Sequence, residues 1–331
     1  MRSSTLLTLL VAAVTAKPTA NAPPPGAVIV KPGDNLQSIV NANAGKTIFL
    51  QAGKYKGPIV IKSKITMMGA TDNEESYSGN KATITIYRAQ EEGFNNHQTA
   101  AVQVEADGVK FYHVNFENTW GLKPSKDPKN PIKNQALAVS TQGDEIGFYG
   151  CKLDGWQDTL ETEGKGARSL GKQVFAKCLV QGCTDFIFGK TAAAWFEDCD
   201  IKVKDKDVGY VTAQGRENKN GGGHYVFNKC EVSGSAKGGS YFLGRPWRPF
   251  AAVMFQNSKL SGVINQAGWS KWKPDNVTEP VGDLEFREYQ NTGAGSDIKG
   301  RKLGKRASGP DSISKTLGGD YNSWVDMKYM K

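Results

Sequence analysis

A short motif that recurs along the sequence constrains the fold more than any other feature. It consists of Phe, two further residues, a Cys position and an alternating polar–apolar pair, as in residues 148–153 (FYGCKL). Copies begin at Phe111, Phe148, Phe175, Phe196, Phe227 and Phe255. The Cys position holds Cys151, Cys178, Cys199 and Cys230 in four copies and Ser258 in another, and the copy at Phe111 is looser. A unit this short cannot bury its apolar face alone, so such repeats stack into a solenoid.

The local patterns favour strands over helices in these repeats. Each copy alternates apolar and polar residues between Gly, Asn and Asp, which indicates strand and turn, and no window keeps a 3.6-residue period. The sequence therefore predicts an all-β protein, a right-handed parallel β-helix. Residues 47–50 and 59–61 are predicted as early strands, with residues 53–58 as the turn between them. A short helix over residues 34–40 is expected to close the open end, and the tail from Asp311 is expected to fold back onto the solenoid.

Two aspartates occupy the same position in neighbouring repeats. Asp158 lies seven residues after Cys151, and Asp185 lies seven residues after Cys178. Equivalent positions on adjacent coils are about 4.8 Å apart. Two carboxylates this close cannot both ionise cheaply, so one pKa rises while the other stays low, which gives an acid beside a nucleophile or base. The alternative is a pair of turn aspartates that cap backbone amides.

A second unusual stretch is residues 241–249 (YFLGRPWRP). Proline on either side of Trp247 fixes the backbone, and Gly244 allows a sharp turn. A rigid loop that presents Arg245 and Trp247 suits a sugar acid, because Arg pairs with carboxylate and an aromatic face stacks on the ring. A packed Trp beside a surface Arg is the alternative. Gln135, at the edge of a predicted strand, is either a fixed amide donor or a polar cap.

Composition narrows the class of partner. The 331-residue chain has a formal charge of +9, which suits a polyanion such as an acidic polysaccharide, unless the surplus Lys only aids solubility. Nucleic acid would need a basic stripe or a known motif, and neither is present. The five cysteines leave at least one unpaired: the repeated ones stack as buried thiols, or Cys178 and Cys199 form a disulfide. Cys178 and Cys183 have no accompanying His cluster, so no metal site is expected.

The N-terminal residues have the pattern of an export signal. Residues 1–16 combine Arg2, an apolar run and small residues before a cleavage point, and the run is too short to span a bilayer. Residues 17–26 form a Pro-rich lead-in, and residues 27–331 are expected to be one domain. The sequence thus predicts a secreted protein without a membrane span, and Asn276 begins the one N-x-S/T glycosylation sequon that we find.

Several blocks, in order, resemble the pectin methylesterase (pectinesterase) family, in its fungal or microbial form. They are residues 135–139 (QALAV), 155–160 (GWQDTL), 185–189 (DFIFG), 212–216 (TAQGR), 243–247 (LGRPW) and 288–293 (EYQNTG). The resemblance implies a parallel β-helix that removes methyl esters from pectin without a cofactor, and we expect it to act as a monomer. By position, it implies Asp185 as nucleophile, Asp158 as acid/base, Gln157 and Gln135 as the anion hole, Arg245 as the residue that holds the nucleophile, and Trp247 as a substrate contact.

The sequence departs from the family pattern near the expected substrate groove. Glu161 stands where an aromatic residue often follows Asp-Thr-Leu, and Trp156 stands where Tyr or Phe is common. These differences leave the preferred methylation pattern open. A pectin depolymerase on the same fold and a non-catalytic glycan-binding solenoid remain alternatives. A serine hydrolase is disfavoured because there is no G-x-S-x-G elbow.

Overall fold

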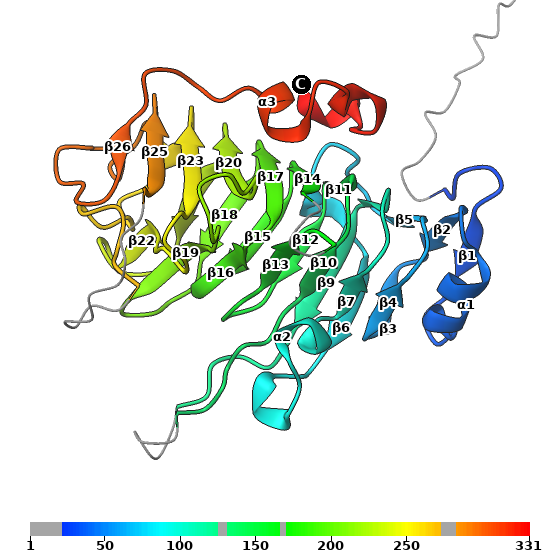
Figure 1. Ribbon diagram of the computed structural model, residues 1–331. Helices are drawn as coiled ribbons and strands as arrows, with labels where there is room; N and C mark the ends of the chain where they lie inside the picture. Colours follow the sequence, from blue (N-terminus) through cyan, green and yellow to red (C-terminus); the bar gives the residue numbers. More distant parts are fainter. Residues whose placement is uncertain (1–21, 125–130, 166–169, 273–282) are drawn as a thin grey trace, which may run out of the picture.

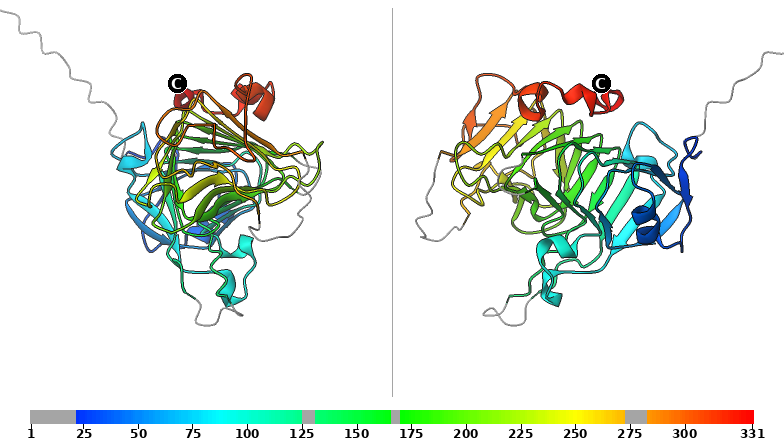
Figure 2. Two further views of the ribbon diagram at one scale, coloured as in Figure 1. Left: turned by 90° about the vertical axis from the view of Figure 1, so that its left-hand side faces the viewer. Right: turned by 45° about the vertical axis from the view of Figure 1, so that its right-hand side comes forward.

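The computed structural model describes residues 22–124, 131–165, 170–272 and 283–331. Its strands stack in three parallel sheets, and successive strands visit the sheets in turn, so the chain forms a parallel β-helix (Figure 1). Figure 2 shows the coils lying one upon another around a closed core. This is the fold that the repeats predict. The predicted signal peptide (1–16) and Asn276 lie outside the described residues, as does all of the lead-in before residue 22.

The first sheet, sheet A, has eleven strands. They are β1 (Val28–Val30), β2 (Thr47–Leu50), β5 (Thr66–Gly69), β8 (Lys110–Tyr112), β11 (Ile146–Tyr149), β14 (Gly171–Ala176), β17 (Ala192–Glu197), β20 (His224–Asn228), β23 (Ala252–Gln256), β25 (Glu285–Tyr289) and β26 (Lys305–Arg306). Sheet B has eight strands. They are β3 (Gly53–Lys56), β6 (Ala82–Ile86), β9 (Val114–Asn118), β12 (Lys152–Asp154), β15 (Leu179–Gly182), β18 (Asp200–Val203), β21 (Glu231–Gly234) and β24 (Lys259–Leu260).

Sheet C has seven strands and carries the polar blocks described above. They are β4 (Ile59–Ile61), β7 (Val102–Val104), β10 (Val139–Gln142), β13 (Leu160–Glu163), β16 (Thr184–Gly189), β19 (Gly209–Gln214) and β22 (Tyr241–Gly244). The described residues also contain seven short helical segments. They are α1 (Leu36–Ala42), α2 (Asn96–Thr99), α3 (Ile313–Leu317) and the 3₁₀ turns η1 (Tyr77–Gly79), η2 (Gln90–Glu92), η3 (Tyr321–Ser323) and η4 (Met327–Met330).

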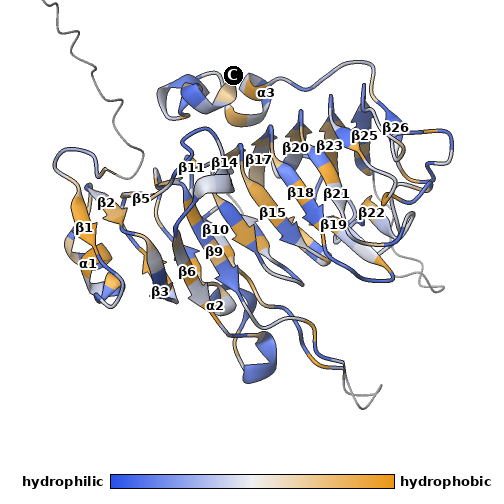
Figure 3. Ribbon diagram, turned by 180° about the vertical axis from the view of Figure 1, so that it is seen from behind, coloured by the Kyte–Doolittle hydropathy of each residue, from blue (hydrophilic) through white to orange (hydrophobic). Residues whose placement is uncertain are grey.

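The recurring motif forms the corner between sheets A and B. The residue before the Cys position has a left-handed backbone in successive coils, as at Lys177 (φ 53°), Lys229 (φ 55°) and Asn257 (φ 52°). One left-handed residue turns the chain sharply, so the Phe is the last residue but one of a strand of sheet A, and the Cys directly precedes a strand of sheet B. The alternation of apolar and polar residues along the strands is visible in Figure 3.

The inward positions of this corner form two ladders. The Phe rings stack coil on coil, with centroids 4.7 Å apart between Phe175 and Phe196 and 4.4 Å apart between Phe196 and Phe227. All five cysteines are buried free thiols. The sequence left a disulfide between Cys178 and Cys199 open, and the structure has the stack of thiols instead.

Two predicted elements need correction. Residues 53–58, predicted as a turn, contain strand β3, which pairs with β6 in sheet B. The prediction was wrong because the Gly and Pro that flank this segment resemble a turn, whereas Tyr55 is buried in the core. The predicted strand that begins at Gln135 starts only at Val139; Gln135 itself makes one isolated bridge to Gln157.

The two ends of the chain pack in different ways. Helix α1 contacts β4 at the first coils, as expected, and Asn35 caps it by accepting from Ser38 N. The C-terminal tail lies along the outer face of sheet A (Figure 1), where Leu317 and Trp324 join Trp195 in a buried cluster. None of the described helices is long and apolar enough to cross a membrane.

The Phe ladder yields a test of the fold. Phe196→Ala removes a fully buried ring between two stacked neighbours, and we expect it to lower the free energy of unfolding by about 3–5 kcal/mol. Val208→Ala, at a position 46% exposed, is the control and should change it by less than about 0.5 kcal/mol. Urea denaturation of both variants measures this; equal effects would contradict a core built on the ladder.

Candidate active site

The two aspartates lie on neighbouring coils at the same edge of sheet C. The backbone of Gln157 bridges that of Thr184, and Asp158 N donates to Thr184 O at 3.0 Å. Asp158 and Asp185 therefore occupy equivalent places, which confirms the register predicted from the repeats. Both have left-handed backbones, with φ of 60° and 49°, a conformation that Asp adopts more readily than most residues.

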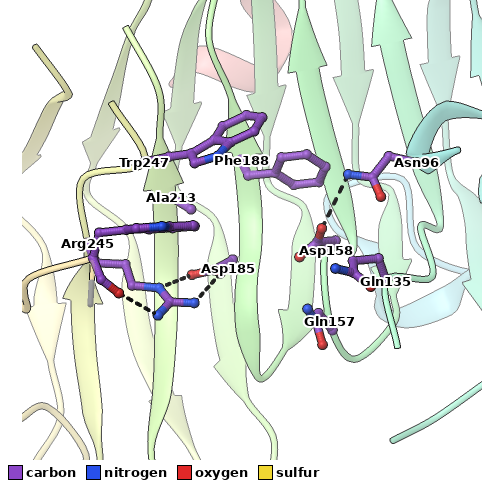
Figure 4. Close-up of a pocket in the computed structure, with 10 residues that line it drawn as sticks. Asn96, Gln135, Gln157, Asp158, Asp185, Phe188, Ala213, Arg245 and Trp247 are labelled. Atoms are coloured by element: carbon purple, nitrogen blue, oxygen red, sulfur yellow. Dashed lines mark hydrogen bonds and ion pairs between the residues drawn. The ribbon is translucent and has the colours of Figure 1, made fainter. Parts of the chain in front are cut away.

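A cavity of about 290 Å³ opens over this edge (Figure 4). All six residues that the sequence singled out for catalysis or binding line it. The complete lining is Asn96, Gln135, Gln157, Asp158, Asp185, Phe188, Ala213, Arg245, Trp247 and Trp272. The residues come from the coils of β10, β13, β16, β19 and β22, from the segment around Trp272 and from α2, so the site depends on the solenoid register.

Arg245 is fixed on Asp185. Its Nε donates to Asp185 Oδ1 at 2.9 Å and its Nη2 to Oδ2 at 2.6 Å. The guanidinium also lies 4.0 Å from the ring centre of Tyr210 and 4.3 Å from that of Trp272. A two-pronged pair of this kind fixes geometry as well as charge, so Asp185 has little rotational freedom.

The two carboxyl groups are in different electrostatic environments. Burial raises the pKa of Asp185, and the hydrogen bonds and charge of Arg245 oppose that rise. Burial raises the pKa of Asp158 well above its usual value, and the negative charges of Asp185 and Glu161 raise it further. Arg245 gives its carboxylate hydrogen bonds to Asp185 alone. Asp158 is therefore the group that keeps its proton when Asp185 is ionised.

Two side-chain amides complete the polar side of the cavity. Gln157 and Gln135 lie on adjacent coils, joined by their backbone bridge. The buried Gln135 Oε1 has no hydrogen-bond partner among the described residues. The side-chain N–H groups of these two residues can donate to an oxygen on which negative charge develops.

The opposite side of the cavity is apolar and aromatic. Phe188 and Trp247 meet edge to face with ring centroids 6.0 Å apart, and Ala213 lies in the same cluster. A Cβ on Gly215 would come within 2.8 Å of the Trp247 ring, so glycine is needed for Trp247 to pack here. The wall offers aromatic rings against which a sugar ring can pack.

Sequence reasoning missed four lining residues. Phe188 and Ala213 stand within blocks that were noticed, and Trp272 ends the aromatic group of residues 269–272 (WSKW), so these three had a signal. Asn96 had none, because it belongs to a short helix in a loop without periodicity. Glu161 is not a lining residue, but it pairs with the lining residue Phe188 across sheet C. Burial raises the pKa of Glu161 to about 7.

The arrangement has the parts that acyl transfer needs. Asp185 can attack a carbonyl carbon, the amides can stabilise the resulting oxyanion, and Asp158 can give a proton to a leaving group. No three metal-binding side chains gather anywhere in the part of the chain that the structure describes.

Comparison with known proteins gives one consistent family. The family model described as Pectinesterase matches residues 33–307. A pectinesterase of Aspergillus niger is 33% identical over the full length of both chains. A probable pectinesterase A of Neosartorya fischeri is 36% identical over 90% of this chain and 86% of its own. The crystal structure of the A. niger pectin methylesterase in deglycosylated form superposes with a TM-score of 0.81 at 30% identity, covering 93% of this chain and 99% of that one.

The pKa of Asp158 predicts how stability depends on pH. The pKa of Asp158 is raised in the folded protein, so the folded protein keeps a proton that the unfolded chain loses. The contribution of Asp158 to the free energy of unfolding therefore falls as pH rises from about 4. We expect Asp158→Asn to unfold at higher urea concentration than wild type at pH 7, with the difference shrinking toward pH 4. The control Asp205→Asn changes an exposed carboxylate and should shift stability by less than about 0.5 kcal/mol. A less stable Asp158→Asn at pH 7 would contradict the assignment.

Proposed function

Because this chain belongs to the pectinesterase family, and is therefore an enzyme, we propose that it hydrolyses the C6 methyl esters of homogalacturonan and releases methanol. The observation that carries the proposal is the Arg245-bound Asp185 beside the buried Asp158, with two amides in the same cavity. The A. niger relative is named for pectin methyl esters, and the net charge of +9 suits an acidic polysaccharide.

The reaction begins with the ionised Asp185. One of its oxygens attacks the ester carbonyl carbon, and the carbonyl oxygen becomes an oxyanion that Gln157 and Gln135 stabilise by hydrogen bonds. The tetrahedral intermediate then collapses, the bond to the methoxy oxygen breaks, and Asp158 donates its proton to that oxygen. Methanol leaves, and the sugar carboxyl is joined to Asp185 as an acyl-enzyme.

The second half returns the enzyme to its starting state. Asp158, now ionised, takes a proton from a water molecule, and the water oxygen attacks the acyl carbon. The bond to Asp185 breaks, Asp185 leaves as a carboxylate paired with Arg245, and the product is a galacturonic acid unit, which then loses its proton to solvent. The two half-reactions need Asp158 first as acid and then as base.

Two other functions remain as outcomes of a test. A depolymerase would need its carboxylates about 5 Å or more apart, on either side of the glycosidic bond, whereas equivalent sites on adjacent strands are about 4.7–4.9 Å apart and face one carbonyl. A binding solenoid would use Trp247, Arg245 and the positive charge, without the need for a buried acid at Asp158.

The decisive experiment follows methanol, reducing ends and unsaturated products from highly methylated pectin. We expect wild type to release methanol without cleaving the chain, and Asp185→Ala to release none. Gln157→Ala should lower kcat by about 10²–10³ and melt at the wild-type temperature. Chain cleavage would establish the depolymerase, and pectin binding without any product would establish the binding module.

The location, processing and oligomeric state of the enzyme are proposed from the sequence. We propose that it is exported, that residues 1–16 are removed, that Asn276 is glycosylated and that the mature protein is a monomer. Mass spectrometry of the secreted protein, before and after glycosidase treatment, and its mass in solution test these points. An intact N-terminus at Met1 would refute the export signal.

A further inference from the structure

The proposed function leaves one requirement unexplained. A protonated carboxyl group has two oxygens, and only the oxygen that bears the proton can donate it to a leaving group. Asp158 must therefore present its proton from the oxygen nearer the substrate, not from the one nearer the protein. The side chain that contacts one of the two oxygens of Asp158 is that of Asn96, the first residue of α2, which also lines the cavity (Figure 4).

The Asn96 side chain is oriented by its own neighbour. Gln90, in η2, donates from Nε2 to Asn96 Oδ1 at 2.5 Å. With its oxygen engaged, Asn96 turns its amide nitrogen toward Asp158, and Nδ2 lies 3.4 Å from Asp158 Oδ2. The contact is long, as such contacts often are before substrate is bound. In Figure 4 the other oxygen of Asp158 turns away from Asn96, to the side of Asp185.

The helix that carries Asn96 is attached to sheet C at two points. Thr99 Oγ1 accepts from Leu137 N at 3.1 Å and donates to Asn96 O at 2.7 Å. His97 Nδ1 lies 2.7 Å from Ser140 Oγ. Ser140 Oγ in turn donates to Glu161 Oε2 at 2.5 Å. These bonds fix α2 above β10 and β13, so Asn96 cannot drift from Asp158.

We propose that Asn96 is a positioning residue for the acid/base: its amide N–H occupies Asp158 Oδ2, so the transferable proton is held on Oδ1, facing the ester. An N–H that donates to Oδ2 leaves Oδ1 as the oxygen that carries the proton. The same N–H stabilises the ionised form of Asp158, which the second half-reaction uses as base. This inference depends on the roles given to Asp158 and Asp185 above.

The other charged groups around Asp158 set the sign of the pH effect. Asp185 on β16 and Glu161 on β13 disfavour its ionisation, whereas Arg245 and Asn96 favour it. The buried thiol of Cys183, before β16, also interacts with it. Removal of the Asn96 donor therefore raises the pKa of Asp158. Since the free enzyme needs Asp158 protonated, the basic limb of kcat/KM moves to higher pH.

The test compares the pH profiles of methanol release for four variants. We expect Asn96→Ala to lower kcat about 10-fold, a part of the 10²–10⁴ that a general acid contributes, and to move the basic limb up by about half to one pH unit. Asn96→Asp keeps the acceptor for Gln90 and the side-chain shape but adds a like charge, so its limb should move further. Gln90→Ala, which frees Asn96, should move it in the same direction by less.

Asn95→Ala is the matched control. Asn95 is exposed and caps α2 by accepting from Gln98 N at 2.9 Å, so its loss loosens the helix without removing the donor to Asp158, and the basic limb should stay in place. An unmoved limb in Asn96→Asp, or an equal shift in Asn95→Ala, would overturn the inference. Turnover that survives in Asp158→Asn would instead overturn the acid/base role of Asp158, and a wild-type protein that releases no methanol would overturn the proposed function.

Discussion

The bidentate pair between Arg245 and Asp185 is the interaction on which the site depends. Taking two carboxylates out of water beside each other is costly, and one cation cannot compensate both equally. Arg245 donates two hydrogen bonds to Asp185 and none to Asp158, so most of the cost falls on Asp158, whose pKa rises well above its usual value. In the mechanism that we propose, this difference makes Asp185 the nucleophile and Asp158 the acid, and the division of roles depends on the single side chain of Arg245.

The solenoid is what brings these groups together. Asp158 and Asp185 are 27 residues apart in sequence, and the ladders β12–β15 and β13–β16 have the same offset, pairing Leu153 with Val180 and Leu160 with Ile187. Arg245 comes from the end of β22, two strands beyond β16 in sheet C. Because the Phe and Cys ladders fix each coil on the next, the strand ends from which these groups project are held in register.

The regular coils of the solenoid could be predicted from the sequence, whereas segments without a clear local pattern could not. The register of Asp158 and Asp185 followed from equal offsets to the Cys positions, and β2 and β4 were predicted to the residue. Strand β3 was missed because flanking Gly and Pro suggested a turn, although Tyr55 is a core residue. Asn96 was invisible, because its place over Asp158 depends on contacts with Gln90 and Leu137 that no local pattern encodes.

The unequal protonation of the two aspartates can be measured directly by ¹³C NMR of the protein labelled at its Asp carboxyl carbons. The account predicts one carboxyl that stays protonated at a pH where Asp185 is ionised, and that is absent from the spectrum of Asp158→Asn. It also predicts that this carboxyl titrates at lower pH in Asp185→Asn, because the neighbouring charge has gone. If the late-titrating carboxyl were missing from Asp185→Asn and present in Asp158→Asn, the roles of acid and nucleophile would be reversed and the account would be wrong.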